Sequence, residues 1–272
     1  MPSASSLVLV NGQRSDSVPV WDRGLQYGDG LFETLRIVNG EPVFWLDHMQ
    51  RLEAGCQRLG IDYPGEALLR RELGELVGAD GRGVLKIIIT RGVSARGYRP
   101  GHGAAGRILL WQPRDVDLAS DARPGWRVTW CRHRLGINPA LAGIKHLNRL
   151  DQVLARAEWD DEFDEGLMLD LDGRLVEGTM SNIFLVMGRT LVTPGLNRCG
   201  VAGIMRKKIL ERAGTLKFET EIRDVAPAEV AKSDELLLCN SVIGIRAVAR
   251  LGEQRWSAFP VSEALREALE LS

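Results

Sequence analysis

The chain has 272 residues, of which 44% are hydrophobic and 26% charged, and its formal net charge is -1. This length favours two modest domains or one large one. The balanced charge gives no sign of the basic surface that nucleic-acid-binding proteins carry. No apolar run approaches the ~20 residues of a membrane-spanning helix, and the first residues lack the regions of a secretory signal. The four cysteines form no CxxC pair, so we expect a reduced, cytoplasmic protein.

The first half of the chain shows alternating strand and helix signals. Two Asn-Gly pairs, at 11–12 and 39–40, predict tight turns. Asp47 is a candidate cap for the first helix. The predicted elements are a strand at 7–10, a hairpin joining 35–37 to 43–45, helices at 47–59 and 65–77, and strands at 84–90 and 107–112. A loop rich in glycine and arginine, 91–106, separates the last two strands.

The second half mixes strands and helices without a regular βαβ rhythm. Its predicted elements are strands at 126–130, 166–170, 182–187, 191–193 and 235–239, and helices at 147–158, at 201–213 and from about 261. A polar segment, 114–124, is the expected linker. We therefore expect an α+β (α/β) protein with an N-terminal α+β domain at 1–113 and a C-terminal α/β domain at 125–272.

The common catalytic and binding motifs are absent from the sequence. No GxGxxG follows a strand, and there is neither a Walker A loop nor a GxSxG elbow. The four histidines show no HExxH or paired spacing, so we expect no metal site. What remains is the class of reaction in which a bound cofactor carries out the difficult step.

Lys145 is the candidate for attaching such a cofactor. It lies among apolar neighbours in the segment Leu141–Leu150, after Gly143 and at the start of a predicted helix. Partial desolvation lowers the pKa of an ammonium group and makes the amine a usable nucleophile. Taken alone, this residue is more typical of a helix lysine whose stem lies along the surface. Whether Lys145 attaches a cofactor is therefore judged from the other segments of the chain.

Several segments together resemble the fold-type IV pyridoxal-phosphate family, a two-domain fold of the D-amino acid aminotransferase type. The family includes branched-chain and D-amino acid aminotransferases and aminodeoxychorismate lyase. The matching segments, in the order the family has them, are Gln26–Glu33, Arg91–Tyr98, Asn138–Leu150, Glu177–Phe184 and Val201–Arg206. The lysine segment resembles that of the lyase, because related aminotransferases usually carry tyrosine where this chain has Arg149.

The resemblance implies that pyridoxal 5′-phosphate (PLP) forms a Schiff base with Lys145. Glu177 is then expected to contact the pyridine nitrogen, where a carboxylate keeps the ring protonated. The phosphate is expected to bind the backbone of Gly203 and Ile204 at a helix start, with Arg51 and Ser241 as further ligands. Each residue alone also fits a plain structural position at a turn or on the surface.

The resemblance also implies a set of substrate-binding residues. Aminodeoxychorismate carries two carboxylates, so arginines over the pocket are expected. The candidates are Arg91, Arg96, Tyr98, Phe32 and Asn182. Phe32 stands where the D-amino acid enzymes have a pocket tyrosine. A phenylalanine cannot make the hydrogen bond of that tyrosine, which favours the lyase branch.

The expected activity is therefore a PLP-dependent carbon–oxygen lyase that acts on 4-amino-4-deoxychorismate and gives 4-aminobenzoate and pyruvate for folate. We expect a homodimer with this small-molecule substrate, and no nucleic-acid or membrane partner. One alternative is a branched-chain or D-amino acid aminotransferase of the same fold. Another is a non-catalytic binding protein that has kept the fold.

Overall fold

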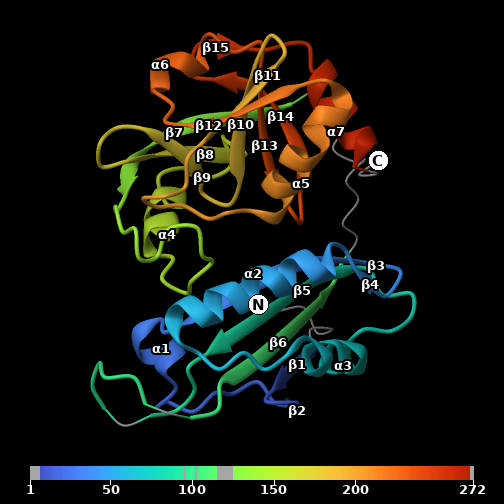
Figure 1. Ribbon diagram of the computed structural model, residues 1–272, viewed down its shortest axis with the longest axis vertical. Helices are drawn as coiled ribbons and strands as arrows, with labels where there is room; N and C mark the ends of the chain where they lie inside the picture. Colours follow the sequence, from blue (N-terminus) through green and yellow to red (C-terminus); the bar gives the residue numbers. More distant parts are fainter. Residues whose placement is uncertain (1–6, 95, 102, 115–124, 270–272) are drawn as a thin grey trace. The chain divides into compact units, whose positions relative to one another are not determined.

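The structure is a computed structural model that describes residues 7–94, 96–101, 103–114 and 125–269. The chain divides into two compact units (Figure 1). Unit 1 comprises the described residues of Met1–Val116 together with Ile144–Asn148. Unit 2 comprises those of Asp117–Gly143 and Arg149–Ser272. The predicted linker 114–124 lies outside the described residues except for Arg114. The predicted second domain, 125–272, differs from unit 2 because Ile144–Asn148 belongs to unit 1.

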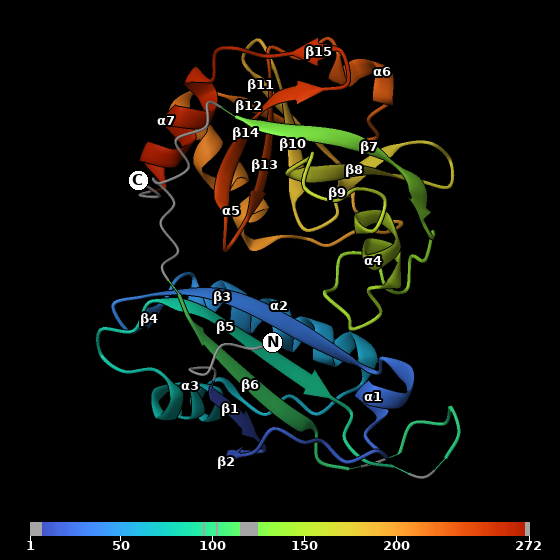
Figure 2. The same ribbon diagram turned by 180° about the vertical axis from the view of Figure 1, so that it is seen from behind.

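Unit 1 is built on an antiparallel sheet. The strands found in its described residues are β1 (Leu7–Val10), β2 (Gln13–Arg14), β3 (Gly30–Val38), β4 (Glu41–Pro42), β5 (Gly83–Thr90) and β6 (Gly106–Pro113), in the order β2-β1-β6-β5-β3-β4. The helices are α1 (Arg23–Tyr27), α2 (Trp45–Leu59) and α3 (Glu66–Leu76). Helix α2 packs on β3, and the view from behind shows β3, β5 and β6 with α2 on their far side (Figure 2).

The burial of β3 explains this packing. Leu31, Leu35 and Ile37 alternate along the strand and are almost completely buried, as expected when one face of a strand meets a helix. The apolar stripe of α2, which includes Leu52, lies against that face. A side chain on Gly55 of α2 would meet Leu31 at 3.0 Å, so the glycine allows the close approach.

Unit 2 has a mixed sheet. In its described residues the strands are β7 (Trp126–Leu135), β8 (Glu165–Asp170), β9 (Leu175–Gly178), β10 (Asn182–Met187), β11 (Thr190–Pro194), β12 (Glu219–Arg223), β13 (Glu235–Asn240), β14 (Gly244–Leu251) and β15 (Gln254–Arg255). Their order is β12-β11-β10-β13-β14-β7-β8-β9, with β15 on β14. The helices are α4 (Leu150–Arg156), α5 (Ile204–Ala213), α6 (Pro227–Val230) and α7 (Pro260–Ala268), with a 3₁₀ turn at Gly214–Leu216.

The core of unit 2 joins strands that are distant in the sequence. Leu167, Ile183, Leu236 and Val248 come from four different strands, and each is fully buried in one cluster. Such a core fixes the ends of β9, β10 and β13, which carry several candidate site residues. Among the described residues, we find no helix that is both long and apolar enough to cross a membrane.

Most predicted elements are confirmed, but three helix starts were wrong, that of α5 being described with the site below. Helix α2 begins at Trp45, so residues 43–45 do not form the second hairpin strand, and Asp47 lies inside the helix instead of capping it. The residue before the helix, Phe44, has a left-handed φ of 57°. The helix predicted from residue 147 begins at Leu150. Strands β12 and β14 were not predicted at all.

Candidate active site

Lys145 lies in a short extended segment that pairs with β3 inside unit 1. The backbone N–H of Phe32 donates to the carbonyl of Lys145 at 3.0 Å. The N–H of Leu147 donates to the carbonyl of Gly30 at the same distance. The prediction that Lys145 stands at the mouth of a helix was therefore wrong. Its backbone is held by a strand, which fixes the position of the side chain more firmly than a fraying helix end would.

Two lysine amines lie at the ring of Phe32. The Nζ of Lys145 is 4.3 Å from the ring centroid, and the Nζ of Lys86 is 5.0 Å from it. Lys86 is on β5 opposite Thr34, so it shares the face of the sheet that carries Phe32. Burial lowers the pKa of Lys86. The electron-rich face of an aromatic ring attracts cations, so the ring of Phe32 favours the position of both lysine amines beside it.

The opposite face of β3 carries a buried carboxylate that fixes Arg51. Glu33 accepts from Nε and Nη2 of Arg51 at 2.8 and 2.5 Å, and it lies 2.6 Å from Nδ1 of His48. Burial alone would raise the pKa of Glu33, but Arg51 and His48 outweigh it and lower the pKa to about 2. Arg51 is thus oriented by Glu33 in a bidentate pair. Its contact with a phosphate stays a prediction.

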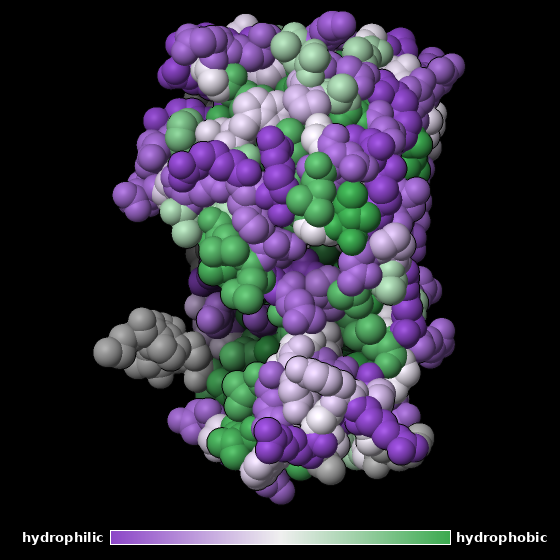
Figure 3. Space-filling view, turned by 90° about the vertical axis from the view of Figure 1, so that its left-hand side faces the viewer, coloured by the Kyte–Doolittle hydropathy of each residue, from purple (hydrophilic) through white to green (hydrophobic). Residues whose placement is uncertain are grey.

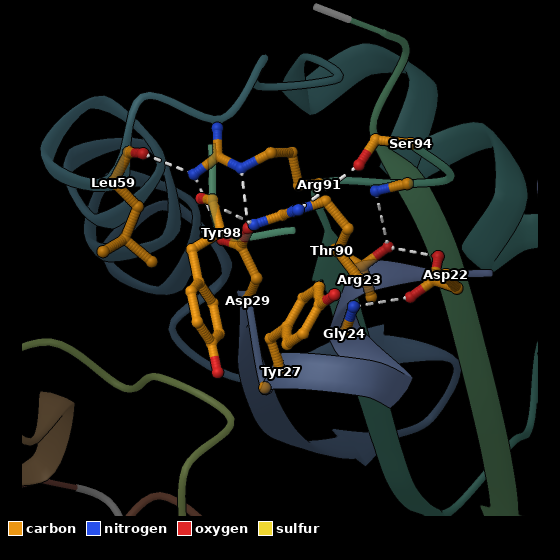
Figure 4. Close-up of polar contacts among 12 residues, drawn as sticks. Asp22, Arg23, Gly24, Tyr27, Asp29, Leu59, Thr90, Arg91, Ser94 and Tyr98 are labelled. Carbon is orange, nitrogen blue, oxygen red and sulfur yellow. Dashed lines mark hydrogen bonds and ion pairs between the residues drawn. The ribbon is translucent and has the colours of Figure 1, made fainter. Parts of the chain in front are cut away.

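Arg91 makes several contacts within unit 1. Its Nε and Nη2 donate to the two oxygens of Asp29 at 2.8 and 3.1 Å (Figure 4). It also donates to the carbonyls of Leu59 and Gly60, at the end of α2, at 2.7 and 2.5 Å. The side chain is buried. Its donors tie the sheet to the last turn of α2, and its contact with the substrate stays a prediction.

A second arginine, which sequence reasoning missed, holds the loop after Arg91. Arg23 donates to Asp29 at 2.8 Å, to the carbonyl of Gly97 at 2.7 Å and to that of Tyr98 at 3.2 Å. Figure 4 shows this guanidinium beside Asp29 and Tyr98. The guanidinium carbon also lies 4.7 Å from the ring centroid of Tyr27. Burial would raise the pKa of Asp29, but the two arginines outweigh it and lower the pKa.

This anchoring leaves two predicted substrate residues on the outside of a fixed loop. Tyr98 is 86% exposed, and its ring lies 5.5 Å from that of Tyr27. Arg96 is exposed as well. Both side chains are therefore available to a ligand, whereas the backbone between them is held by Arg23. Their contact with the substrate stays a prediction.

In unit 2, Glu177 and Asn182 lie at the ends of two strands that are consecutive in the sequence. Glu177, on β9, is buried and accepts from the N–H of Val201 at 2.8 Å. Asn182 donates to the carbonyl of Val201 at 2.8 Å and accepts from the N–H of Gly203 at 3.1 Å. Its amide therefore joins the start of β10 to the start of α5. The contact of Asn182 with the substrate stays a prediction.

The start of α5 has the properties of an anion site. The predicted helix 201–213 begins three residues later, at Ile204, with Gly203 as its N-cap. Within the described residues, no side chain caps it. The first-turn N–H groups have no acceptor inside a helix, and the helix dipole favours negative charge there. A Cβ on Gly203 would lie 2.0 Å from Oδ1 of Asn182, so only glycine fits.

Two more polar residues lie near these elements. Burial lowers the pKa of Arg206, in the first turn of α5, whose guanidinium donates to Thr193 Oγ1 at 3.1 Å. Ser241 is half-buried in the turn after β13. Asn240 fixes that turn, because its side chain accepts from the N–H of Val242 at 2.8 Å. Ser241 is thus held at a strand end, and its phosphate contact stays a prediction.

Comparison with known proteins decides the family. The model of the amino-transferase class IV family matches residues 30–251, which is most of the chain. The protein belongs to this family. An aminodeoxychorismate lyase of Vibrio harveyi is 35% identical over 94% of this chain and 96% of its own. A D-alanine aminotransferase of Bacillus licheniformis is 28% identical over 91% and 89%.

A solved structure agrees with these sequence relatives. The crystal structure of 4-amino-4-deoxychorismate lyase from Pseudomonas aeruginosa matches with a TM-score of 0.90 and 47% identity. The match covers 97% of this chain and 98% of that one. The expected fold class, α+β of fold type IV, and the expected family are confirmed. PLP is the cofactor of this family.

The family's lysine segment was found from the sequence, but Lys86 and Arg23 were not. Lys86 did leave a signal, because it is the single charge in an apolar strand run, Val84–Thr90. A charge in such a run is expected to have a specific neighbour. Arg23 left no such signal. Its contacts with Asp29 and Gly97 depend on how a loop returns to the sheet.

Proposed function

We propose that the protein is a PLP-dependent lyase that converts 4-amino-4-deoxychorismate into 4-aminobenzoate and pyruvate. The observation that carries the proposal is the pair of amines at Phe32. Lys145 supplies an amine for covalent attachment, and Lys86 supplies a second cation for a carboxylate of the substrate. The lyase relatives, at 35% and 47% identity, support this reading over that of an aminotransferase.

The residues present fit the parts of PLP. In unit 1, Lys145 provides the amine that its aldehyde needs, and Arg51 provides a cation for its phosphate. In unit 2, the uncapped start of α5 at Gly203 and Ile204 suits the phosphate, with Ser241 as a further donor. Glu177 is the buried carboxylate for the pyridine nitrogen. When bound, PLP draws electrons away from the carbon that bears the substrate amine.

The proposed reaction needs one proton to move and one bond to break. Lys145 removes the proton from the amine-bearing carbon of the substrate. The electrons left behind expel the enolpyruvyl oxygen, and the ring becomes aromatic. Lys145 then gives the proton to the methylene carbon of the departing enolpyruvate, which becomes pyruvate. Lys86, Arg96 and Tyr98 are proposed to bind the carboxylates and keep the leaving group in place.

The test is to mix purified protein with 4-amino-4-deoxychorismate and to measure pyruvate and 4-aminobenzoate. Equal amounts of both products support the lyase. Exchange of an amine between an amino acid and an oxo acid, without these products, supports an aminotransferase. A protein that binds neither PLP nor substrate covalently, and gives a colourless preparation, supports the non-catalytic alternative.

We also propose that the protein is a cytoplasmic homodimer. Figure 3 shows apolar patches on the surface of each unit, in hydrophilic surroundings. Leu150, Val153 and Leu154 on α4 are more than half exposed and lie on one side of the helix. An apolar stripe of this kind is typical of an interface between subunits. The measurement is the mass in sedimentation, and a Val153→Glu variant is expected to shift that mass from dimer to monomer.

A further inference from the structure

A buried carboxylate outside the expected set of site residues holds the turn between Glu177 and Asn182. Glu165, the first residue of β8, is fully buried. Its Oε1 accepts from the N–H of Gly166 at 2.9 Å and from the N–H of Thr179 at 3.1 Å, and the Thr179 hydroxyl also donates to it. Its Oε2 accepts from the N–H of Met180 at 3.1 Å and from the hydroxyl of Ser181 at 2.8 Å.

These hydrogen bonds come from most of the residues in the turn that joins two site residues. The turn also closes on itself, because the N–H of Gly178 donates to the carbonyl of Ser181 at 2.6 Å. A Cβ on Gly178 would lie 2.4 Å from Oγ of Ser181 and 2.9 Å from Oε2 of Glu165. The backbone therefore approaches the carboxylate as closely as glycine permits. Glu177 and Asn182 are the residues on either side of this turn.

We propose that Glu165 is a positioning residue for the cofactor site, which it serves by fixing the Gly178–Ser181 turn and hence the side chains of Glu177 and Asn182. The inference rests on the proposed function, because it assumes that Glu177 faces the cofactor ring. Glu165 itself lies among backbone N–H groups. It acts on the cofactor through Glu177, and through the Asn182 amide that reaches Gly203.

The chemistry of the contacts predicts that an amide cannot replace this carboxylate. Each oxygen of Glu165 faces at least one backbone N–H, which is a fixed donor. In a Glu165→Gln variant, the new NH₂ group must point at one of these donors whichever way it turns. A buried N–H then loses its acceptor, which is unfavourable. The turn is expected to shift in order to avoid this contact.

Glu235 provides a matched control within the same unit. It is also buried, and it accepts from the N–H groups of Val261 and Ser262 at 2.6 and 3.0 Å and from the Ser262 hydroxyl at 2.8 Å. It holds the start of α7, and among the described residues it makes no hydrogen bond to the Gly178–Ser181 turn. Glu235→Gln therefore repeats the loss of stability without the change at the turn.

The experiment compares the two holoproteins with the wild type by their visible spectra and by the rate of cofactor loss during dialysis. Glu165→Gln is expected to shift the visible band and to lose PLP about tenfold faster, the change that ~1.4 kcal/mol gives. Glu235→Gln is expected to keep the wild-type band and rate. Melting temperatures of both variants show that the comparison is between folded proteins.

A milder pair of variants covers the case in which Glu165→Gln does not fold. Ser181→Ala removes one hydroxyl bond to Glu165, and Ser262→Ala removes the equivalent bond to Glu235. Only Ser181→Ala is expected to speed cofactor loss. Equal rates in the two members of a pair, or a wild-type rate in the Glu165 or Ser181 variant, would overturn the inference. A wild-type protein that binds no PLP would overturn the proposed function itself.

Discussion

At the scale of single residues, the Lys86 amine beside Phe32 distinguishes the proposed lyase site from a site that binds only the cofactor. Lys86 and Lys145 share one aromatic ring, yet only Lys145 lies in the segment that resembles the family's lysine motif. Burial lowers the pKa of Lys86, which shows that the amine is partly removed from water. A partly desolvated cation binds a carboxylate more strongly than a fully solvated one.

We predict that Lys86→Met raises KM for 4-amino-4-deoxychorismate and changes kcat less. A hydrogen bond to a charged group contributes about 1.5–3 kcal/mol, so kcat/KM is expected to fall roughly 10- to 150-fold. Steady-state kinetics measure both constants. The exposed Lys232 is the control, and Lys232→Met is expected to keep wild-type kinetics. An unchanged KM in Lys86→Met would contradict the proposed contact between Lys86 and a substrate carboxylate.

Glu33 predicts how stability depends on pH. Its pKa in the folded protein is about 2, below the ordinary value of 4.5. A carboxylate with a lowered pKa stabilises the folded state fully above its unfolded pKa, and this stabilisation is lost as the pH falls toward the folded pKa. The loss between about pH 5 and pH 2 is therefore expected to be ~3 kcal/mol, from the shift of the pKa.

The measurement is the free energy of unfolding in urea across this pH range. Glu33→Gln is expected to be less stable at neutral pH and to lose less stability than the wild type as the pH falls. Glu219→Gln, at an exposed position on β12, is the control for a change of one surface charge. Parallel curves for the wild type and Glu33→Gln would contradict the assigned pairing with Arg51 and His48.

At the scale of elements, a single arginine side chain, that of Arg23, anchors the loop that follows β5. Arg23 donates to two backbone carbonyls of the loop, those of Gly97 and Tyr98, and its charge is balanced by Asp29. Helix α1 carries Arg23, and Asp22 caps that helix by accepting from the N–H of Gly24 at 2.8 Å. The loop is therefore anchored to a capped helix.

We predict that Arg23→Met loosens this loop. Two partly buried carbonyls lose their donor, and the backbone around Arg96 is expected to open more often. Trypsin cuts after arginine unless proline follows, so the rate of cleavage between Arg96 and Gly97 measures the opening. We expect a rise of about tenfold, corresponding to ~1.4 kcal/mol, and a raised KM. Arg14→Met, at an exposed position, is the control. A wild-type cleavage rate in Arg23→Met would contradict the anchoring role.

The start of α5 gives a second prediction at this scale. Gly203→Ala places a Cβ 2.0 Å from Oδ1 of Asn182, which must move away. The variant is expected to lose ~1–3 kcal/mol of stability and to hold PLP less tightly. Gly214→Ala, at the other end of the same helix, meets no atom within 4 Å and is expected to be neutral. Thermal unfolding and the loss of PLP in dialysis measure both effects, and equal behaviour of the two variants would count against this prediction.

At the scale of the whole molecule, the sequence predicts the family and the strands better than it predicts the partners of polar residues. The lysine segment and most strands were found because short motifs and apolar runs are local signals. Leu147 and Asn148 were placed in a helix, because the pairing of their segment with β3 joins residues more than a hundred positions apart. The contacts of Arg91 with Asp29 and of Asn182 with Val201 were not predicted for the same reason, since tertiary structure decides where their donors point.

The most direct test of the account is product formation by the wild type and by Lys145→Ala. The wild-type holoprotein is expected to convert 4-amino-4-deoxychorismate into equal amounts of 4-aminobenzoate and pyruvate. Lys145→Ala is expected to be at least about a thousandfold slower, because it lacks both the attachment point and the proton carrier. Absence of both products from the wild-type reaction, or full activity in Lys145→Ala, would contradict the central claim.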